Sequence, residues 1–202
     1  VDGDGRVSEF EYKPEAPDSD VITTEVFAYE ARSLLRTLDE LAEEGDGSSI
    51  RDFGHELLPR LVAEGAARAF ELDGYWRDVG TIESYWEAHM ELLADEPPLT
   101  LDDPAWPILT MGLQRPPARI EGSATIDGCL VAGGSHVRGT VARSIIGPGV
   151  VVEEGAEVRD AVLLHDSHVG ARARVTRAIL DEEANVGEDT VVSLDTFNDP
   201  GV

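Results

Sequence analysis

Four short aliphatic blocks recur in the second half of the chain: Cys129-Leu130-Val131, Ile145-Ile146-Gly147, Val162-Leu163-Leu164 and Ile179-Leu180-Asp181. Successive blocks begin 16, 17 and 17 residues apart, and between them aliphatic residues return every six positions, as in Ile146, Val152, Val158 and Leu164. About six residues per face and eighteen per turn describe a triangular coil that stacks its aliphatic residues on the next coil. Residues 121–202 are therefore predicted to form a left-handed parallel β-helix of hexapeptide repeats. A β-sandwich with regular turns is the competing interpretation, which the clear period disfavours.

The first 96 residues alternate between helix and strand patterns. Strand patterns cover residues 6–13, which we interpret as a hairpin, 21–29 and 66–70. Helix patterns cover residues 34–42, which Gly45 should end, and 52–65, where Pro59 should fall in the first turn or produce a kink. Residues 1–96 are thus predicted to be the C-terminal part of an α/β domain, with any nucleotide-binding front half upstream of Val1, because no glycine-rich phosphate loop is present.

A proline-rich segment, residues 97–120, separates the two halves. Proline-rich chain is extended and semi-rigid, so this segment is predicted to be a linker that connects the two halves without folding into a domain of its own. Trp106 and Ile108 are its large apolar residues, and we expect them to hold the linker against a domain surface.

The stretch Tyr75-Trp76-Arg77-Asp78-Val79-Gly80-Thr81 leads into an amphipathic helix, for which Thr81 is a suitable N-cap. Asp78 is predicted to lie at the end of a strand, just before a tight turn and a helix. In α/β sheets ligands bind at such positions. The alternative is that Asp78 only pairs with Arg77 or caps the turn.

The composition narrows the possible partners. The chain carries 41 acidic and 16 basic side chains, for a net charge of −25, which argues against nucleic acid and anionic membranes as partners. A phosphate substrate would require locally gathered positive charge or a metal. Cys129 is the only cysteine, which suits a reducing compartment such as the cytoplasm, and no apolar run is long enough to cross a membrane.

Several of these segments together resemble the glucose-1-phosphate adenylyltransferase (ADP-glucose pyrophosphorylase) family. They are residues 75–81, Asp52-Phe53-Gly54, Phe10-x-x-Lys13-Pro14, Trp106-Pro107-Ile108 and the β-helix pattern that follows. The resemblance covers nearly the whole chain. It implies that residues 1–96 belong to a Rossmann-like nucleotidyltransferase domain.

The resemblance also implies an activity and a set of site residues. ATP and glucose 1-phosphate would give ADP-glucose and pyrophosphate, with Mg²⁺ as the cofactor and with Asp78 as its ligand and as the catalytic residue. Lys13 would bind the sugar phosphate, and Asp52, Phe53 and Trp76 would line the glucose pocket, although Asp52 could equally be a helix cap. The family further implies a homo-oligomer, a tetramer, built through the β-helix. Without a nucleotide-binding half, this chain alone is expected to be inactive.

Four positions depart from the family pattern. Tyr12 stands in place of a glutamate, Val21 and Glu25 in place of a serine and a tyrosine, and His55 in place of a lysine. These departures leave open a non-catalytic regulatory relative of the enzyme. A hexapeptide-repeat acyltransferase is a further alternative, since His165 or His168 near a coil corner could be a general base; a histidine in a polar surface turn is the favoured interpretation.

Overall fold

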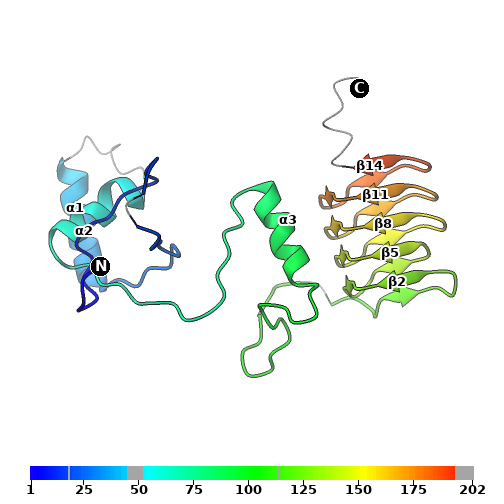
Figure 1. Cartoon of the computed structure of the whole chain (residues 1–202), viewed down its shortest axis with the longest axis horizontal. Helices are drawn as coiled ribbons and strands as arrows, with labels where there is room; N and C mark the ends of the chain where they lie inside the picture. Colours follow the sequence, from blue (N-terminus) through cyan, green and yellow to red (C-terminus); the bar gives the residue numbers. More distant parts are fainter. Residues whose placement is uncertain (18, 45–51, 113, 194–202) are drawn as a thin grey trace, which may run out of the picture. The chain divides into compact units, whose positions relative to one another are not determined.

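The computed structural model describes residues 1–17, 19–44, 52–112 and 114–193 (Figure 1). The chain divides into two compact units, Val1–Trp76 and Arg77–Val202. The domain boundaries predicted at residues 96 and 120 remain a prediction. Among the described residues, no helix combines the length and the apolar character needed to span a bilayer.

The first unit is built from helices. They are α1 (Ala31–Glu44), the π-helical turn η1 (Phe53–Leu57) and α2 (Leu58–Ala63). Leu57 and Leu61 are buried at the centre of the unit together with Thr37 of α1. Pro59 lies in the first turn of α2, where its missing N–H removes no helical hydrogen bond, as predicted. The expected stop of the first helix at Gly45 lies outside the described residues.

The strands predicted in this half are wrong for the described residues. Segments 6–13 and 66–70 meet only in one antiparallel bridge, Arg6 with Arg68, and the segment 21–29 forms no strand. Val21, Ile22 and Val26 are 65–83% exposed. A strand is stable only when neighbouring strands satisfy its backbone groups and cover one face, and the described residues supply no such neighbours here.

The second unit begins with helix α3 (Ile82–Glu91), which starts as predicted. The Thr81 hydroxyl accepts a hydrogen bond from Ser84 N at 3.0 Å, and Ser84 Oγ accepts one from Thr81 N at 3.1 Å. This reciprocal capping box satisfies two N–H groups that the helix itself cannot bond.

The second half of the chain is a parallel β-helix, which confirms the fold predicted from the repeat and excludes the sandwich (Figure 1). Three parallel sheets form its faces, and every neighbouring pair of strands within them is parallel. The first sheet contains β1 (Arg119–Ile120), β4 (His136–Val137), β7 (Val151–Val152), β10 (His168–Val169) and β13 (Asn185–Val186). The second contains β2 (Thr125–Asp127), β5 (Thr140–Ala142), β8 (Glu157–Arg159), β11 (Arg174–Thr176) and β14 (Val191–Ser193). The third contains β3 (Leu130–Val131), β6 (Ile145–Ile146), β9 (Val162–Leu163) and β12 (Ile179–Leu180).

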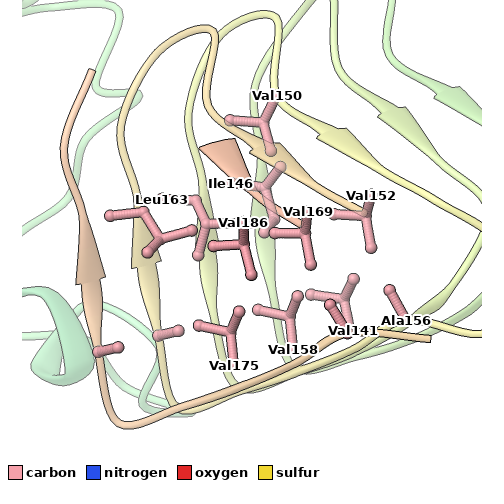
Figure 2. Packing of buried hydrophobic residues seen from close by; sticks show 14 of the residues in the cluster. Val141, Ile146, Val150, Val152, Ala156, Val158, Leu163, Val169, Val175 and Val186 are labelled. Atoms are coloured by element: carbon pink, nitrogen blue, oxygen red, sulfur yellow. The ribbon is translucent and has the colours of Figure 1, made fainter. Parts of the chain in front are cut away.

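One aliphatic residue of each strand from β2 to β14 points inward and stacks on its counterparts in the neighbouring coils. Val152, Val158 and Leu163 come from the three faces of one coil and are at most 1% exposed (Figure 2). Each such side chain contributes about 1.5–3 kcal/mol by leaving water. Because these contacts run between coils, no single coil could bury them alone.

The corners of the β-helix place several residues other than glycine in the left-handed backbone region. Arg143, Asp160 and Arg177 recur at one corner with φ of 46°, 50° and 47°. This conformation costs roughly 1–2 kcal/mol for a residue with a Cβ. Arg143 Nε donates to Asp160 Oδ1 at 2.6 Å, so a bond between adjacent coils partly offsets that cost at this corner.

Helix α3 lies against the outer face of the third sheet. Trp86 Nε1 donates to the carbonyl oxygen of Asp160 at 2.8 Å, and the guanidinium of Arg177 lies 5.4 Å from the Trp86 ring centroid. Val162 alternates with the inward-facing Leu163 and therefore points outward, yet it is fully buried. The burial of this outward-facing side chain agrees with the position of α3 next to the third sheet.

The linker is held differently from the expectation. Trp106 and Ile108 are 84% and 57% exposed, so the prediction that they pin the linker to a surface is wrong. Instead Arg115 forms a bidentate pair with Asp166, its two terminal nitrogens lying 2.7 and 2.6 Å from the two carboxylate oxygens. An ion pair to the turn between β9 and β10 takes the role expected of the apolar residues.

Candidate active site

Tyr12 and Asp52, forty positions apart in sequence, meet in the first unit. Asp52 is the N-cap of η1, and its Oδ1 accepts a hydrogen bond from Gly54 N at 2.7 Å. Its Oδ2 accepts one from the Tyr12 hydroxyl at 2.6 Å. The bond from Tyr12, followed by the bond from Gly54, holds the pKa of the Asp52 carboxyl below its usual value. The capping interpretation of Asp52 is therefore correct, and the carboxylate is fixed at both oxygens.

Lys13 follows Tyr12 directly and is the only lysine of the chain. Its backbone has φ of 48°, and its Nζ lies 5.1 Å from the centroid of the Tyr12 ring. Side-chain hydrogen bonding with Tyr12 is the largest cause that raises the pKa of Lys13, so its side chain stays cationic. A cation beside a fixed carboxylate and an aromatic ring offers complementary contacts to a molecule that carries both phosphate and hydroxyl groups.

Two further predicted pocket residues keep exposed aromatic surface. Phe53 is the first residue of η1 and is 57% exposed, and Trp76, the last residue of the first unit, is 39% exposed. The structure thus brings Lys13 and Asp52 together through Tyr12 and places Phe53 next to Asp52 in the chain. The roles of Phe53 and Trp76 in a sugar pocket remain a prediction.

Asp78 belongs to the second unit, where it forms the turn before α3. Its Oδ1 accepts a hydrogen bond from Gly80 N at 3.1 Å, so the turn-capping role is confirmed. Arg77 does not pair with it; Arg77 binds Glu87 and, at 3.0 Å, Glu91. No strand precedes Asp78 in the described stretch 75–80, so the predicted strand end is wrong. The position of Asp78 is set by its turn and by the capped start of α3, and no strand in the described stretch contributes to it.

The surroundings of Asp78 fit a magnesium ion held mainly by substrate. The carboxylate is exposed and supplies the hard oxygen ligand that Mg²⁺ prefers. The described residues contain no cluster of three or more histidine, cysteine or acidic side chains that could hold a metal by themselves. Mg²⁺ usually binds one or two carboxylates and completes its shell with phosphates and water. One exposed carboxylate is therefore compatible with it.

The two histidines singled out on the β-helix lie in different settings. His165 is in a turn, 3.5 Å from Glu182, whereas His168 is in β10, 3.5 Å from Glu153. The polar-turn interpretation therefore holds for His165 only. His168 borders a hollow of about 290 Å³ that also includes Asn185 and Glu188. The Nδ1 atoms of both histidines are buried without a hydrogen-bond partner among the described residues.

Sequence reasoning missed the most specific contact of the first unit, the Tyr12–Asp52 bond. A Cβ built on Gly54 would lie 2.1 Å from the Tyr12 ring, so this glycine is the one local signal of the packing. Glycine is common in an Asp-x-Gly capping turn for reasons that do not involve a neighbouring ring, so the sequence alone could not reveal this packing.

Comparison with known proteins agrees with this division of the chain. Residues 1–95 match the nucleotidyl transferase family, and residues 116–201 match the GlmU-like C-terminal hexapeptide family. A nucleotidyltransferase sequence followed by a hexapeptide β-helix defines the class of protein.

Individual relatives narrow the class. The glucose-1-phosphate adenylyltransferase of Acetivibrio thermocellus is 35% identical over 191 residues, which are 94% of this chain and 44% of the relative. The protein of the same name from Thermotoga maritima is 39% identical over 161 residues, which are 79% of this chain and 38% of the relative. The one from Bacillus mycoides is 35% identical over 187 residues, which are 92% of this chain and 49% of the relative. The chain is similar to glucose-1-phosphate adenylyltransferases over most of its own length and spans less than half the length of these relatives.

Proposed function

We propose that this chain supplies the sugar-phosphate side of an enzyme that converts ATP and glucose 1-phosphate into ADP-glucose and pyrophosphate. The observation that carries the proposal is the identity of 35% with a glucose-1-phosphate adenylyltransferase over 94% of this chain. The joined Lys13, Tyr12 and Asp52 side chains support it, because they combine a cation for phosphate with fixed acceptors for hydroxyl groups. ADP-glucose would serve as a glucosyl donor for glycogen or a related glucan.

The proposed reaction is an in-line displacement. An oxygen of the glucose 1-phosphate attacks the α-phosphorus of ATP, and the bond to the β-phosphate oxygen breaks as pyrophosphate leaves. Lys13 would bind the attacking phosphate, and Asp52, Phe53 and Trp76 would orient the glucose. Asp78 would hold Mg²⁺, which when bound offsets the charge that develops on the transferred group. Catalysis of this kind rests on positioning and electrostatics.

The test is steady-state kinetics of the full-length enzyme, with each substrate varied at saturating Mg²⁺. Asp78→Asn keeps the shape and removes the charge that would bind the metal, so the loss should fall mainly on kcat. Lys13→Ala should raise KM for glucose 1-phosphate by roughly ten- to a hundredfold and leave KM for ATP nearly unchanged. Asp73→Asn, a nearby acidic residue, is the matched control. Near wild-type turnover of Asp78→Asn would refute the metal role.

The kinetic test also decides the second candidate, a non-catalytic regulatory relative. Val21 and Glu25, at two positions where the resemblance expects sugar-phosphate contacts, lie in exposed irregular chain, which favours this candidate. A full-length protein that binds glucose 1-phosphate but forms no ADP-glucose would establish it.

The assembly and location of the protein are also proposals. We propose a homo-oligomer, a tetramer, formed through the β-helix, because the terminal coils of a β-helix leave strand edges that need covering. Sedimentation of the full-length protein as a monomer would refute it. A cytoplasmic location is proposed because Cys129 is a free thiol, and burial raises the pKa of that thiol and so lowers its reactivity.

A further inference from the structure

Two departures from the family pattern touch each other. Tyr12 and His55, where the resemblance leads one to expect glutamate and lysine, have ring centroids 4.5 Å apart in an edge-on arrangement. They come from two separate segments, one ending at Pro14 and the other opening η1. The contact joins the segment that carries Lys13 to the segment that carries Asp52.

The Tyr12 side chain contacts Asp52, Lys13, Gly54 and His55. Its hydroxyl donates to Asp52 at 2.6 Å, and one face lies 5.1 Å from the Lys13 ammonium. The ring also fills the space beside Gly54, where no Cβ would fit, while His55 meets it edge-on. Any shift of the ring would therefore move Lys13 and Asp52 relative to one another.

We propose that Tyr12 and His55 act as a coupled pair of positioning residues that holds Asp52 and Lys13 in register for a sugar phosphate. The nature of the ligand rests on the proposed function. Neither side chain of the pair needs to touch the reacting atoms. Their effect on the ligand passes through the Asp52 carboxylate and the Lys13 ammonium.

Electrostatics determine how the pair responds to substitution. In Tyr12→Glu a second carboxylate would stand beside Asp52, and the hydroxyl donor to Asp52 would be lost; like charges in contact repel. In His55→Lys an ammonium would approach Lys13, which already carries a positive charge, without a carboxylate at position 12 to pair with. In the double variant the glutamate and the lysine can pair with each other, so most of the damage of each single change should be reversed.

The experiment is a double-mutant cycle in the full-length enzyme with the parent, Tyr12→Glu, His55→Lys and the double variant. Each single change should raise KM for glucose 1-phosphate by about tenfold, the size of one lost charge-assisted contact. The double variant should return to within about threefold of the parent, since its new pair replaces the lost interaction. Changes in KM for ATP and in kcat should stay within about twofold, because the affected groups bind the sugar side. His165→Lys, on the β-helix, is the matched control and should leave all three values unchanged.

A direct binding measurement uses the fact that the chain contains one lysine. Reductive ¹³C-methylation labels Lys13 together with the other amines of the full-length protein; the Lys13 signal is identified by its loss when Lys13→Arg is added to the parent and to each variant, and titration with glucose 1-phosphate should shift it. Titration with inorganic phosphate shows how much of the shift comes from the phosphate alone. In the two single variants, the glucose 1-phosphate titration should require about tenfold more ligand, and the double variant should recover.

The outcomes separate the two proposals. If the parent forms ADP-glucose and the effects of the single changes multiply in the double variant, Tyr12 and His55 act independently and the pair inference is wrong. If the parent forms no ADP-glucose but the Lys13 signal shows the coupled pattern with glucose 1-phosphate, the proposed function fails and the pair inference stands. A parent that neither turns over nor binds glucose 1-phosphate overturns both.

Discussion

At the scale of single residues, Tyr12 shows how one neutral side chain can contact two groups of opposite charge. Its hydroxyl donates to Asp52 at 2.6 Å, and its ring faces the Lys13 ammonium, so it serves an anion and a cation at once. An aromatic ring has few rotatable bonds and loses little entropy when it is fixed. The chain carries a net charge of −25, and a neutral group here avoids adding a carboxylate beside Asp52.

Substitution of Gly54 tests this packing. A Cβ at Gly54 would lie 2.1 Å from the Tyr12 ring, so Gly54→Ala must displace the ring. Overpacking of this kind typically destabilises by about 1–3 kcal/mol, and urea unfolding of the full chain, followed by circular dichroism, measures it. Gly74→Ala is the control, because a Cβ there meets no atom within 4 Å. In a Tyr12→Ala background Gly54→Ala should cost almost nothing further; an equal cost in both backgrounds would contradict the model of ring displacement.

The bidentate pair between Arg115 and Asp166 predicts a pH dependence. The hydrogen bond from Arg115 holds the pKa of the Asp166 carboxyl below its ordinary value. A carboxyl whose pKa is depressed in the folded state adds stability above its unfolded pKa of about 3.9, and this stability disappears as pH falls through the lower folded pKa. The melting temperature of Asp166→Asn should therefore lie below that of the parent at pH 6, and the two should converge near pH 2.

An NMR titration gives the second measurement of this pair. In Arg115→Gln the side chain keeps its polarity and loses its charge, so the pKa of Asp166 should rise toward its ordinary value. Arg119→Gln, which replaces a more exposed arginine, should leave the Asp166 titration unchanged. An Asp166 pKa that is the same in Arg115→Gln and in the parent would show that the ion pair does not form in solution.

At the scale of elements, the sequence predicted what depends on local signals and on short periods. Thr81 and the apolar spacing after it define the start of α3, and the six-residue repeat of Leu163, Val169 and Val175 determines the β-helix. The strands expected at 6–13 and 21–29 were wrong because a strand exists only with partners, which a single segment does not specify. The Tyr12–Asp52 bond was missed for the same reason, since it joins residues forty positions apart.

The docking of α3 is predicted to depend on Trp86. Trp86→Phe keeps an aromatic ring but removes the N–H that binds the Asp160 carbonyl oxygen at 2.8 Å, which should weaken the attachment by about 0.5–1.5 kcal/mol. Amide hydrogen exchange of α3 should then accelerate by several-fold, while the strands of the β-helix core keep their protection. Trp106→Phe is the matched control, because Trp106 is 84% exposed. Unchanged exchange in Trp86→Phe would mean that the helix is held by other contacts.

At the scale of the whole molecule, the sign of the charge is the dominant feature. The chain has 41 acidic and 16 basic side chains, and many of the basic ones already pair between coils, as Arg143 does with Asp160 and Arg172 with Asp189. The acidic side chains outnumber the basic ones by 25 (41 − 16), and these excess carboxylates repel one another. This repulsion favours solubility and opposes compaction. It also explains why a phosphate ligand would need the local cation that Lys13 supplies.

The last prediction concerns salt. Added salt screens two opposing terms, the repulsion among the excess carboxylates and the attraction within ion pairs. Exposed ion pairs contribute little to stability, whereas the repulsion sums over the whole surface, so the repulsion should dominate. The melting temperature should rise as NaCl is increased from about 10 mM to about 0.5 M, where the Debye length falls from roughly 30 Å to below 8 Å. KCl should act alike, since the effect depends on ionic strength.

A variant with three negative charges fewer in the exposed linker region, Asp95→Asn/Glu96→Gln/Asp102→Asn, should show a smaller rise of the melting temperature with salt. A melting temperature that falls with salt would mean that the ion pairs between coils contribute more to stability than the repulsion takes away. The net charge would then overstate how much the acidic surface destabilises the fold.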